Sequence, residues 1–317
     1  MCKNCTNIHD LNVRDPFILS VTTEKKYYLY SKKKHKDSRE NSLSIVAYES
    51  TDLIWWSEPV ITFEADDDFW GPLDFWAPEV HMWKGKYYLF CSFRNAGTYR
   101  GCQCLVSDSP LGPFVPVKNE PVTPKDWHCL DGTLYIDLKE KPWMVFCHEW
   151  TQVQDGQMVA IELSDDLSEA VGKPSILFRA SEAPWKFTKS RGGLGWGRVT
   201  DGPFLYRARN GELLMLWSSF SDTGYTIGYA RSKSGEIHGP WLQEADPIYS
   251  QNGGHGMLFT TFEGKLVLTI HSPNIAGNER LLMFEMEDKN GKLRIINELT
   301  GNWLCNRYNP DGTKKIK

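Results

Sequence analysis

The chain has 317 residues; that length suggests about two domains, although single all-β folds of roughly 250 residues are common. Its formal net charge of −4 gives no basic footprint for nucleic acid. No window has the eighteen or so consecutive apolar residues of a membrane helix, so neither a nucleic acid nor a membrane is an expected partner.

The N-terminus and the cysteines bear on the cellular compartment. The first residues, MCKNCTNIHDLNVRDPF, contain no apolar stretch of the kind that signal peptides carry. Eight cysteines at irregular spacings predict reduced and mostly buried thiols. Both features predict a cytoplasmic protein, although a secreted chain trimmed of its leader would have the same sequence. Nothing in the sequence predicts the oligomeric state.

Five related segments follow one another along the chain. Asp15 begins DPFILS, Ala77 begins APEVHMW, Asp131 begins DGTLYID, Asp201 begins DGPFLYR and His255 begins HGMLFTT. Each segment is followed by a turn with Gly or charged residues and then by a second apolar run, which predicts a hairpin. The second runs are KKYYLYSK, GKYYLFCSF, KPWMVFCHEW, NGELLMLWSSF and EGKLVLTIHSP. Third runs follow them: SIVAYEST, CQCLVSDS, QMVAIELS, YTIGYARS and RLLMFEME.

These repeats predict the fold. Five units of about 50 to 70 residues, each with three or four short antiparallel strands, are typical of a five-bladed β-propeller. We therefore predict an all-β protein in which residues 1–317 form a single propeller domain. The first strand of each blade lines the central channel, so we expect Asp15, Ala77, Asp131, Asp201 and His255 to form one ring around the axis.

The predicted ring has the chemistry of a hydrolase. Three carboxylates close to one axis repel each other, so their pKa values must differ. One protonated acid and one ionised base are what the hydrolysis of a glycosidic bond requires. A separation of about 6.5 to 9.5 Å leaves room for water and inverts the anomeric carbon, whereas about 5 to 5.5 Å retains it. Positions across a propeller channel favour the larger separation.

The motifs RDPFI, FWAPEV, DGTLYI, DGPFLY and GGHGMLF, in this order and from about Val13 to Arg280, resemble glycoside hydrolase family 43. The resemblance implies a five-bladed propeller that hydrolyses an oligosaccharide or polysaccharide with inversion, commonly an α-L-arabinofuranoside or a β-D-xyloside. It also implies Asp15 as general base, Asp131 as the residue that tunes and orients the acid, and Asp201 as general acid. His255 matches an axial histidine that commonly helps to hold a calcium ion through water. No organic cofactor is implied.

One position departs from the family pattern, in which the acid is usually Glu. Asp201 is one methylene shorter, which would withdraw its carboxyl by about 1.5 Å. Glu149 in FCHEWTQ is the rival acid, and it can instead bind substrate hydroxyls.

Aromatic and basic residues near the predicted rim are candidates for substrate contact. Trp76 lies beside the ring, where its face could stack on a sugar. The other candidates are Trp150, Arg198, Phe220 and Arg280, together with Trp185 and Trp196 in a connection expected to lie over the channel mouth.

The sequence favours an α-L-arabinofuranosidase and leaves other functions open. β-Xylosidase and β-galactofuranosidase activities suit the same scaffold. A glycoside phosphorylase would need Arg and Lys residues clustered near the ring, and the strand-start positions have none. A sugar-binding propeller without catalysis would have little use for three ring carboxylates.

Overall fold

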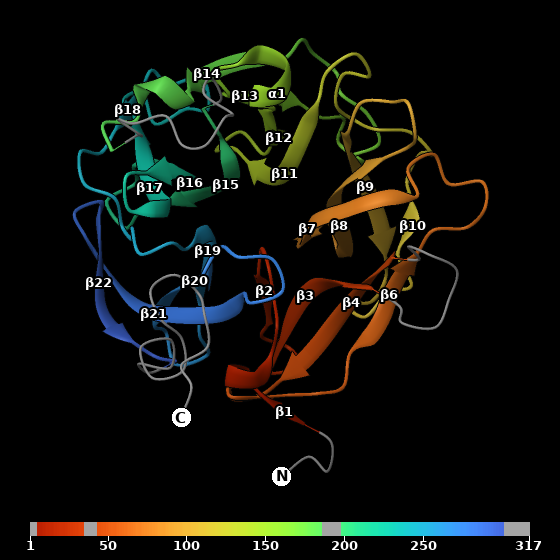
Figure 1. Ribbon diagram of the computed structural model, residues 1–317, viewed down its shortest axis with the longest axis horizontal. Coiled ribbons are helices and arrows are strands. Elements are labelled where there is room, and N and C mark those ends of the chain that lie inside the picture. The colour runs from red at the N-terminus through yellow and green to blue at the C-terminus, as the bar shows by residue number, and fades with distance from the viewer. Residues whose placement is uncertain (1–4, 35–42, 186–197, 301–317) are drawn as a thin grey trace.

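The computed structural model describes residues 5–34, 43–185 and 198–300, which form a five-bladed β-propeller (Figure 1). The predicted fold class is confirmed. Each blade is a four-stranded antiparallel sheet, and within it the strands follow one another outward from the axis. Among the described residues, no helix is long and apolar enough to span a membrane.

The strands of the blades match the predicted runs. The first blade contains β2 (Phe17–Val21), β3 (Lys26–Lys34), β4 (Leu43–Ser50) and β6 (Val60–Glu64), and the second β7 (Leu73–Trp83), β8 (Lys86–Arg94), β9 (Gly101–Ser107) and β10 (Val115–Pro116). The third contains β11 (Cys129–Ile136), β12 (Pro142–His148), β13 (Gln157–Glu162) and β14 (Ser175–Arg179). The fourth contains β15 (Asp201–Arg207), β16 (Leu213–Ser221), β17 (Gly224–Ser232) and β18 (Trp241–Gln243), and the fifth β19 (Gly254–Thr260), β20 (Leu266–Ser272), β21 (Arg280–Lys289) and β22 (Lys292–Glu298).

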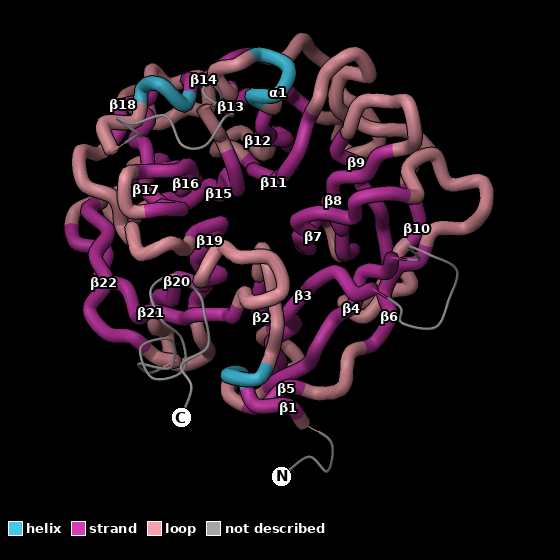
Figure 2. The backbone as a smooth tube through the Cα atoms, in the orientation of Figure 1, coloured by secondary structure: helices cyan, strands magenta, loops and turns pink. Residues whose placement is uncertain are grey.

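A few short elements lie outside the five blade sheets (Figure 2). A small ribbon pairs β1 (Thr6–Asn7) with β5 (Trp55–Trp56) beside the first blade. The helical segments of the described residues are η1 (Ile8–Asp10), α1 (Trp150–Val153) and η2 (Ala180–Glu182).

The hydrophobic core lies between neighbouring blades. One buried cluster joins the third and fourth blades through residues such as Val145, Phe178 and Trp217. Other clusters fill the remaining gaps between blades. Because each sheet is covered on both faces, its second strand is a continuous apolar run rather than an alternating one. This explains the apolar character of the second runs in the sequence.

Side-chain contacts join the first and last blades. Asn12 Nδ2 donates to the carbonyl oxygens of Gly277, at 2.8 Å, and Glu279, at 3.0 Å. Arg14 Nη1 pairs with Glu279 Oε1 at 3.0 Å. These bonds hold the segment before β2 against the fifth blade, so the first and last blades meet and complete the circle of the propeller.

The cysteines only partly follow the sequence-based expectation. Five of them are free and buried, namely Cys91, Cys102, Cys104, Cys129 and Cys147. Cys5 takes part in a disulfide bond, so the prediction of uniformly reduced thiols is wrong for this residue.

The ring positions share one backbone conformation. Asp15, Ala77, Asp131, Gly202 and His255 all have φ between 47° and 57°. Such left-handed angles are uncommon outside glycine and cost roughly 1–3 kcal/mol each. The ring is therefore confirmed in four blades, but in the fourth blade Gly202 holds the equivalent position and Asp201 precedes it.

The strand pairing explains this one-residue correction. Asp201 pairs with Ser218 ahead of a bulge in β15, as Leu130 pairs with Cys147 ahead of a bulge in β11. The structural equivalent of Asp201 is thus Leu130 rather than Asp131. The sequence-based alignment of the two Asp-Gly motifs matched Asp201 to Asp131, and it was therefore shifted by one residue in the fourth blade.

Candidate active site

Three ring residues, Asp15, Asp131 and His255, are held by a side chain from the preceding blade. Ser92 Oγ accepts a hydrogen bond from the Asp131 N–H at 2.8 Å, and Ser218 Oγ accepts one from the His255 N–H at 2.8 Å. His271 Nδ1 accepts one from the Asp15 N–H at 3.2 Å. These bonds hold the strained backbone of the ring, so the side chains that it carries are aimed at the axis.

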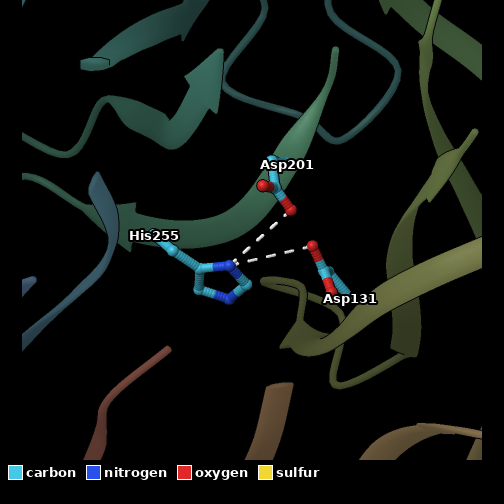
Figure 3. A group of neighbouring side chains, drawn as sticks. All are labelled: Asp131, Asp201 and His255. Atoms are coloured by element: carbon cyan, nitrogen blue, oxygen red, sulfur yellow. Dashed lines mark ion pairs between the residues drawn. The ribbon is translucent and has the colours of Figure 1, made fainter. Parts of the chain in front are cut away.

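Three carboxylates surround the ring of His255. Its Nδ1 lies 3.2 Å from Asp15 Oδ1, 3.8 Å from Asp131 Oδ2 and 3.7 Å from Asp201 Oδ1. Figure 3 shows the histidine entering from β19 between Asp201 and Asp131, which come from β15 and β11. The predicted convergence of these four side chains is therefore observed.

The charges in this cluster stabilise one another. Burial lowers the pKa of His255, but Asp15, Asp131 and Asp201 outweigh it and raise this pKa to about 10. Burial raises the pKa of Asp15, but the charge of His255 and the nearby His271 and Arg14 hold it well below its usual range. At neutral pH the cluster accordingly contains an imidazolium and an ionised Asp15.

Asp131 and Asp201 form a hydrogen-bonded carboxyl pair. Burial, followed by the charge of Asp201, raises the pKa of Asp131 well above its usual range. Burial also raises the pKa of Asp201, but the hydrogen bond with Asp131 and the contact with His255 bring it below its usual range. Two buried carboxyls this close share one proton. The side chain of Asp201 is 21% exposed and that of Asp131 only 5%, so Asp201 is the member that faces solvent.

Steric crowding by His255 explains why glycine occupies position 202. A Cβ on Gly202 would lie 2.8 Å from Cγ of His255, well inside van der Waals contact. The Gly202 N–H also donates to Asp131 Oδ2 at 3.1 Å. Only glycine leaves room for the imidazole at this ring position, so the carboxylate of the fourth blade must come from the neighbouring residue.

Sequence reasoning missed two residues of the site, Tyr225 and His271. The Tyr225 hydroxyl donates to Asp201 Oδ2 at 2.5 Å. The Tyr225 ring stacks on His271 with centroids 5.5 Å apart, and His271 Nδ1 lies 3.3 Å from Asp15 Oδ1. Tyr225 comes from the third strand of its blade and His271 from the second, so neither lies on the strand that lines the channel. The one available signal was a polar side chain at the end of an apolar run, as in LTIHS.

The rival acid Glu149 belongs to a separate ion-pair network. Its Oε2 lies 2.6 Å from Arg100 Nη1, and Arg100 Nε lies 3.0 Å from Asp74 Oδ2. Arg94 also pairs with Asp74 at 2.9 Å. The Arg100 guanidinium lies 3.8 Å from the centroid of the Trp76 ring. This part of Trp76 is therefore covered by a cation, which limits the ring surface left for a sugar.

The remaining candidates lie at different depths. Trp150 begins α1 and is half-buried, whereas Arg198 is exposed and its N–H donates to the Gln154 carbonyl. Phe220 is half-buried and packs against Tyr225, with 5.1 Å between the ring centroids. Arg280 begins β21 and donates to the Glu279 carbonyl at 2.8 Å.

Of the two tryptophans in the long connection, Trp185 is 9% exposed and packs on Trp217. The prediction that Trp185 contacts substrate is therefore wrong, because its ring belongs to the core. Trp196 and most of the connection predicted to cover the channel mouth lie outside the described residues.

Asp131, Asp201 and His255 offer ligand atoms within 4.8 Å of one another, a spacing that a metal ion can bridge. Calcium, however, prefers six to eight oxygen ligands. Without a bound cation, the three carboxylates raise the pKa of His255 to about 10, so the imidazole is protonated at neutral pH. The donor set fits an imidazolium held by carboxylates better than a directly bound calcium ion.

The same distances bound the gap between Asp15 and Asp201. Their Oδ1 atoms lie 3.2 and 3.7 Å from one nitrogen, so these two oxygens are at most about 7 Å apart, a bound that includes both the retaining separation and the shortest inverting one. A buried acid–base set of this kind can act on a glycosidic bond.

Comparisons with known proteins agree with this chemistry. The family model described as glycosyl hydrolases family 43 matches residues 7–287. The extracellular exo-alpha-(1->5)-L-arabinofuranosidase ArbA of Cellvibrio japonicus (strain Ueda107) is 24% identical over 271 residues, covering 74% of each chain. The extracellular endo-alpha-(1->5)-L-arabinanase 1 of Bacillus subtilis (strain 168) is 25% identical over 215 residues, covering 65% of this chain and 57% of that protein. The crystal structure of an endo-arabinase from Bacteroides thetaiotaomicron VPI-5482 superposes with a TM-score of 0.83 at 44% identity, covering 92% and 99% of the two chains.

Proposed function

This chain belongs to glycosyl hydrolases family 43, and we propose that within it the protein cleaves α-L-arabinofuranosidic linkages with inversion at the anomeric carbon. The observation that supports this linkage most is the 44% identity with the endo-arabinase over 92% of the chain. The two curated relatives named above also act on arabinose-containing linkages by their names. The solved structure of the β-xylosidase RS223 is 18% identical and supports the fold alone, and the xylosidase/arabinosidase 43A of Humicola insolens is 26% identical over only 35% of this chain.

Asp15 is the proposed general base. Its carboxyl is ionised, and its buried Oδ1 has no well-aligned hydrogen bond. A general base needs such a free lone pair to take a proton from the attacking water. Arg14, 3.6 Å from Asp15 Oδ2, and the two histidines keep this carboxylate charged until the water is bound.

Asp201 is the proposed general acid, and Asp131 holds the shared proton for it. Asp201 is the more exposed member of the pair, so a leaving oxygen can reach it. The proton held by Asp131 moves to Asp201 as Asp201 donates to the leaving oxygen, and the Tyr225 hydroxyl and His255 stabilise the Asp201 carboxylate that remains. Asp131 tunes the pKa of Asp201 through their shared hydrogen bond.

A panel of aryl glycosides tests the linkage. We expect turnover of the α-L-arabinofuranoside to exceed that of the β-D-xyloside and the β-D-galactofuranoside. NMR of the first product should show an inverted anomeric configuration, and a retained configuration would contradict the mechanism. Product analysis on linear arabinan separates the two relatives' modes of action. Arabinose alone indicates exo cleavage, and a ladder of oligosaccharides indicates endo cleavage.

Phosphorolysis is the second enzyme class to test. It would need unpaired cations grouped at the ring. Of the cations described near the ring, Arg14 pairs with Glu279, and Arg100 pairs with both Asp74 and Glu149. Only Lys32 has no ion pair among the described residues, and a single ammonium is not the cluster of cations that phosphate binding would need. We therefore expect turnover to be independent of phosphate.

A further inference from the structure

One position on the second strand of every blade points at the next blade. The position is found from the strand pairing. In each blade, the residue two places after the ring residue pairs with a residue of the second strand, and the position lies two residues after that partner on the second strand. The five equivalent residues are Lys32, Ser92, Cys147, Ser218 and His271. Three of them, Ser92, Ser218 and His271, accept the backbone N–H of the next ring residue.

Lys32 occupies this position in the first blade, and its side chain also reaches the next blade. Its Nζ lies 5.7 Å from the centroid of the Trp76 ring. The ring residue there is Ala77, which has no functional group. The second blade therefore contributes no reactive side chain to the ring, and an ammonium group from the first blade stands beside that position.

The ammonium of Lys32 differs from the other cations around the ring. Arg14 and Arg100 each contact carboxylates within 4 Å, whereas no carboxylate of the described residues forms an ion pair with Lys32. The side chain is half-buried, and burial lowers its pKa even though the charge of Asp15 opposes this. A partly desolvated ammonium that no described carboxylate neutralises is costly to keep. Apart from the face of Trp76, the described residues offer its three N–H groups no partner, so these groups can donate to a ligand.

The charge balance indicates which ligand suits this donor. Asp15 and the singly protonated Asp131–Asp201 pair carry two negative charges, and His255 and Lys32 carry two positive charges. The cluster is thus close to neutral with Lys32 included. An anionic sugar would add an uncompensated charge to a buried site, whereas hydroxyl groups use the free N–H donors without disturbing the balance.

We propose that Lys32 is a substrate-binding residue that donates hydrogen bonds to hydroxyl oxygens of the sugar unit held between Asp15 and Ala77, and so determines which sugar is accepted. The proposal rests on the glycoside hydrolase activity proposed above but not on the identity of the sugar. Lys32 touches no bond that is broken, so it acts through the position and affinity of the substrate.

The test combines variants with deoxygenated substrates. Lys32→Met keeps the length of the side chain and removes its donors, and Lys33→Met changes the exposed neighbour on the same strand as a matched control. On the aryl α-L-arabinofuranoside, Lys32→Met should lower kcat/KM by about 10- to 150-fold, the range for a hydrogen bond from a charged donor. With one monodeoxy analogue, the loss should shrink to a few-fold. Lys33→Met should match the wild type on every substrate.

A merely electrostatic role for Lys32 predicts a different pattern. The loss would then be equal for every deoxy analogue, the acidic limb of the pH profile would shift with the pKa of Asp15, and Lys32→Arg would restore full activity. That result would overturn the proposal. The melting temperatures of Lys32→Met and Lys32→Arg show whether a loss of activity comes from unfolding instead.

The identity of the sugar is tested independently. If a different aryl glycoside is the one cleaved, the arabinofuranoside assignment fails, and the same cycle with deoxy analogues of that sugar still tests Lys32. If no aryl glycoside is cleaved, calorimetric binding of L-arabinose and D-xylose to Asp15→Asn, with and without Lys32→Met, gives the answer. Equal affinities would reject the proposal.

Discussion

Replacing Tyr225 with Phe removes the hydrogen bond that its hydroxyl donates to the Asp131–Asp201 pair and leaves the aromatic ring in place. The hydroxyl donates to Asp201 Oδ2 at 2.5 Å from a fully buried ring. Burial and the charge of Asp201 raise the pKa of Tyr225, so the phenol stays neutral and remains a donor. The stacking of the ring on His271 needs no hydroxyl and is kept in the variant.

The size of the effect follows from the strength of this bond. A hydrogen bond to a charged group contributes about 1.5–3 kcal/mol, and one pKa unit corresponds to about 1.4 kcal/mol. The bond stabilises ionised Asp201, so its loss should raise the pKa of the Asp131–Asp201 pair by about one to two units. The acid then keeps its proton to higher pH, and the basic limb of kcat/KM should move upward by the same amount.

The assay is the pH profile of kcat/KM on an arabino-oligosaccharide whose leaving group needs protonation. Tyr229→Phe is the matched control, because Tyr229 is a buried residue of the same strand whose hydroxyl accepts from the Leu293 N–H, at 3.4 Å. That variant should leave the limb in place. A basic limb that stays fixed or moves downward in Tyr225→Phe would refute the assignment of Asp201 as the acid.

Asp15→Asn should lower kcat by about 10² to 10⁴ without changing the melting temperature much, and near-normal hydrolysis would remove Asp15 as the base. Asp201→Ala should abolish cleavage of a natural arabinoside yet spare a nitrophenyl arabinoside, whose leaving group needs no proton. Glu149→Gln should weaken both substrates alike, and the reverse pattern would make Glu149 the acid. Chelation should leave activity unchanged, because His255 is expected to be an imidazolium rather than a calcium ligand; a loss that calcium restores would support the metal site implied by the family resemblance. The folded-state pKa of His255, about 10, lies above its usual 6.5, so its stabilisation is complete below pH 6.5 and declines as pH rises toward 10. Calorimetry should therefore show the melting temperature falling across this range, and falling less in His255→Gln.

The blades could be predicted because their signals are local. A turn between two apolar runs is set by residues adjacent in the chain, as in the hairpin of β15 and β16. The repeat of that pattern placed Asp15, Asp131 and His255 at equivalent positions, and their shared left-handed backbone confirms it. Their convergence on the axis followed from the repeat alone.

The position of Asp201 required the pairing of the strands. A β-bulge changes which residue of a strand faces the axis. The sequence Asp-Gly does not show whether the aspartate or the glycine takes the ring position. In the third blade the aspartate occupies the ring position, but in the fourth the glycine does, because the imidazole of His255 fills the space where a side chain would stand.

The partners of the carboxylates were decided by tertiary structure alone. His271 meets Asp15 across 256 positions of the chain, and Tyr225 meets Asp201 from an outer strand of the same blade. The stacking of Arg100 on Trp76 and the reach of Lys32 toward the second blade arise in the same way. Repeats in a sequence reveal positions that are equivalent within each blade. Contacts between blades depend on the different side chains that each blade places there, and these chains meet only when the propeller closes.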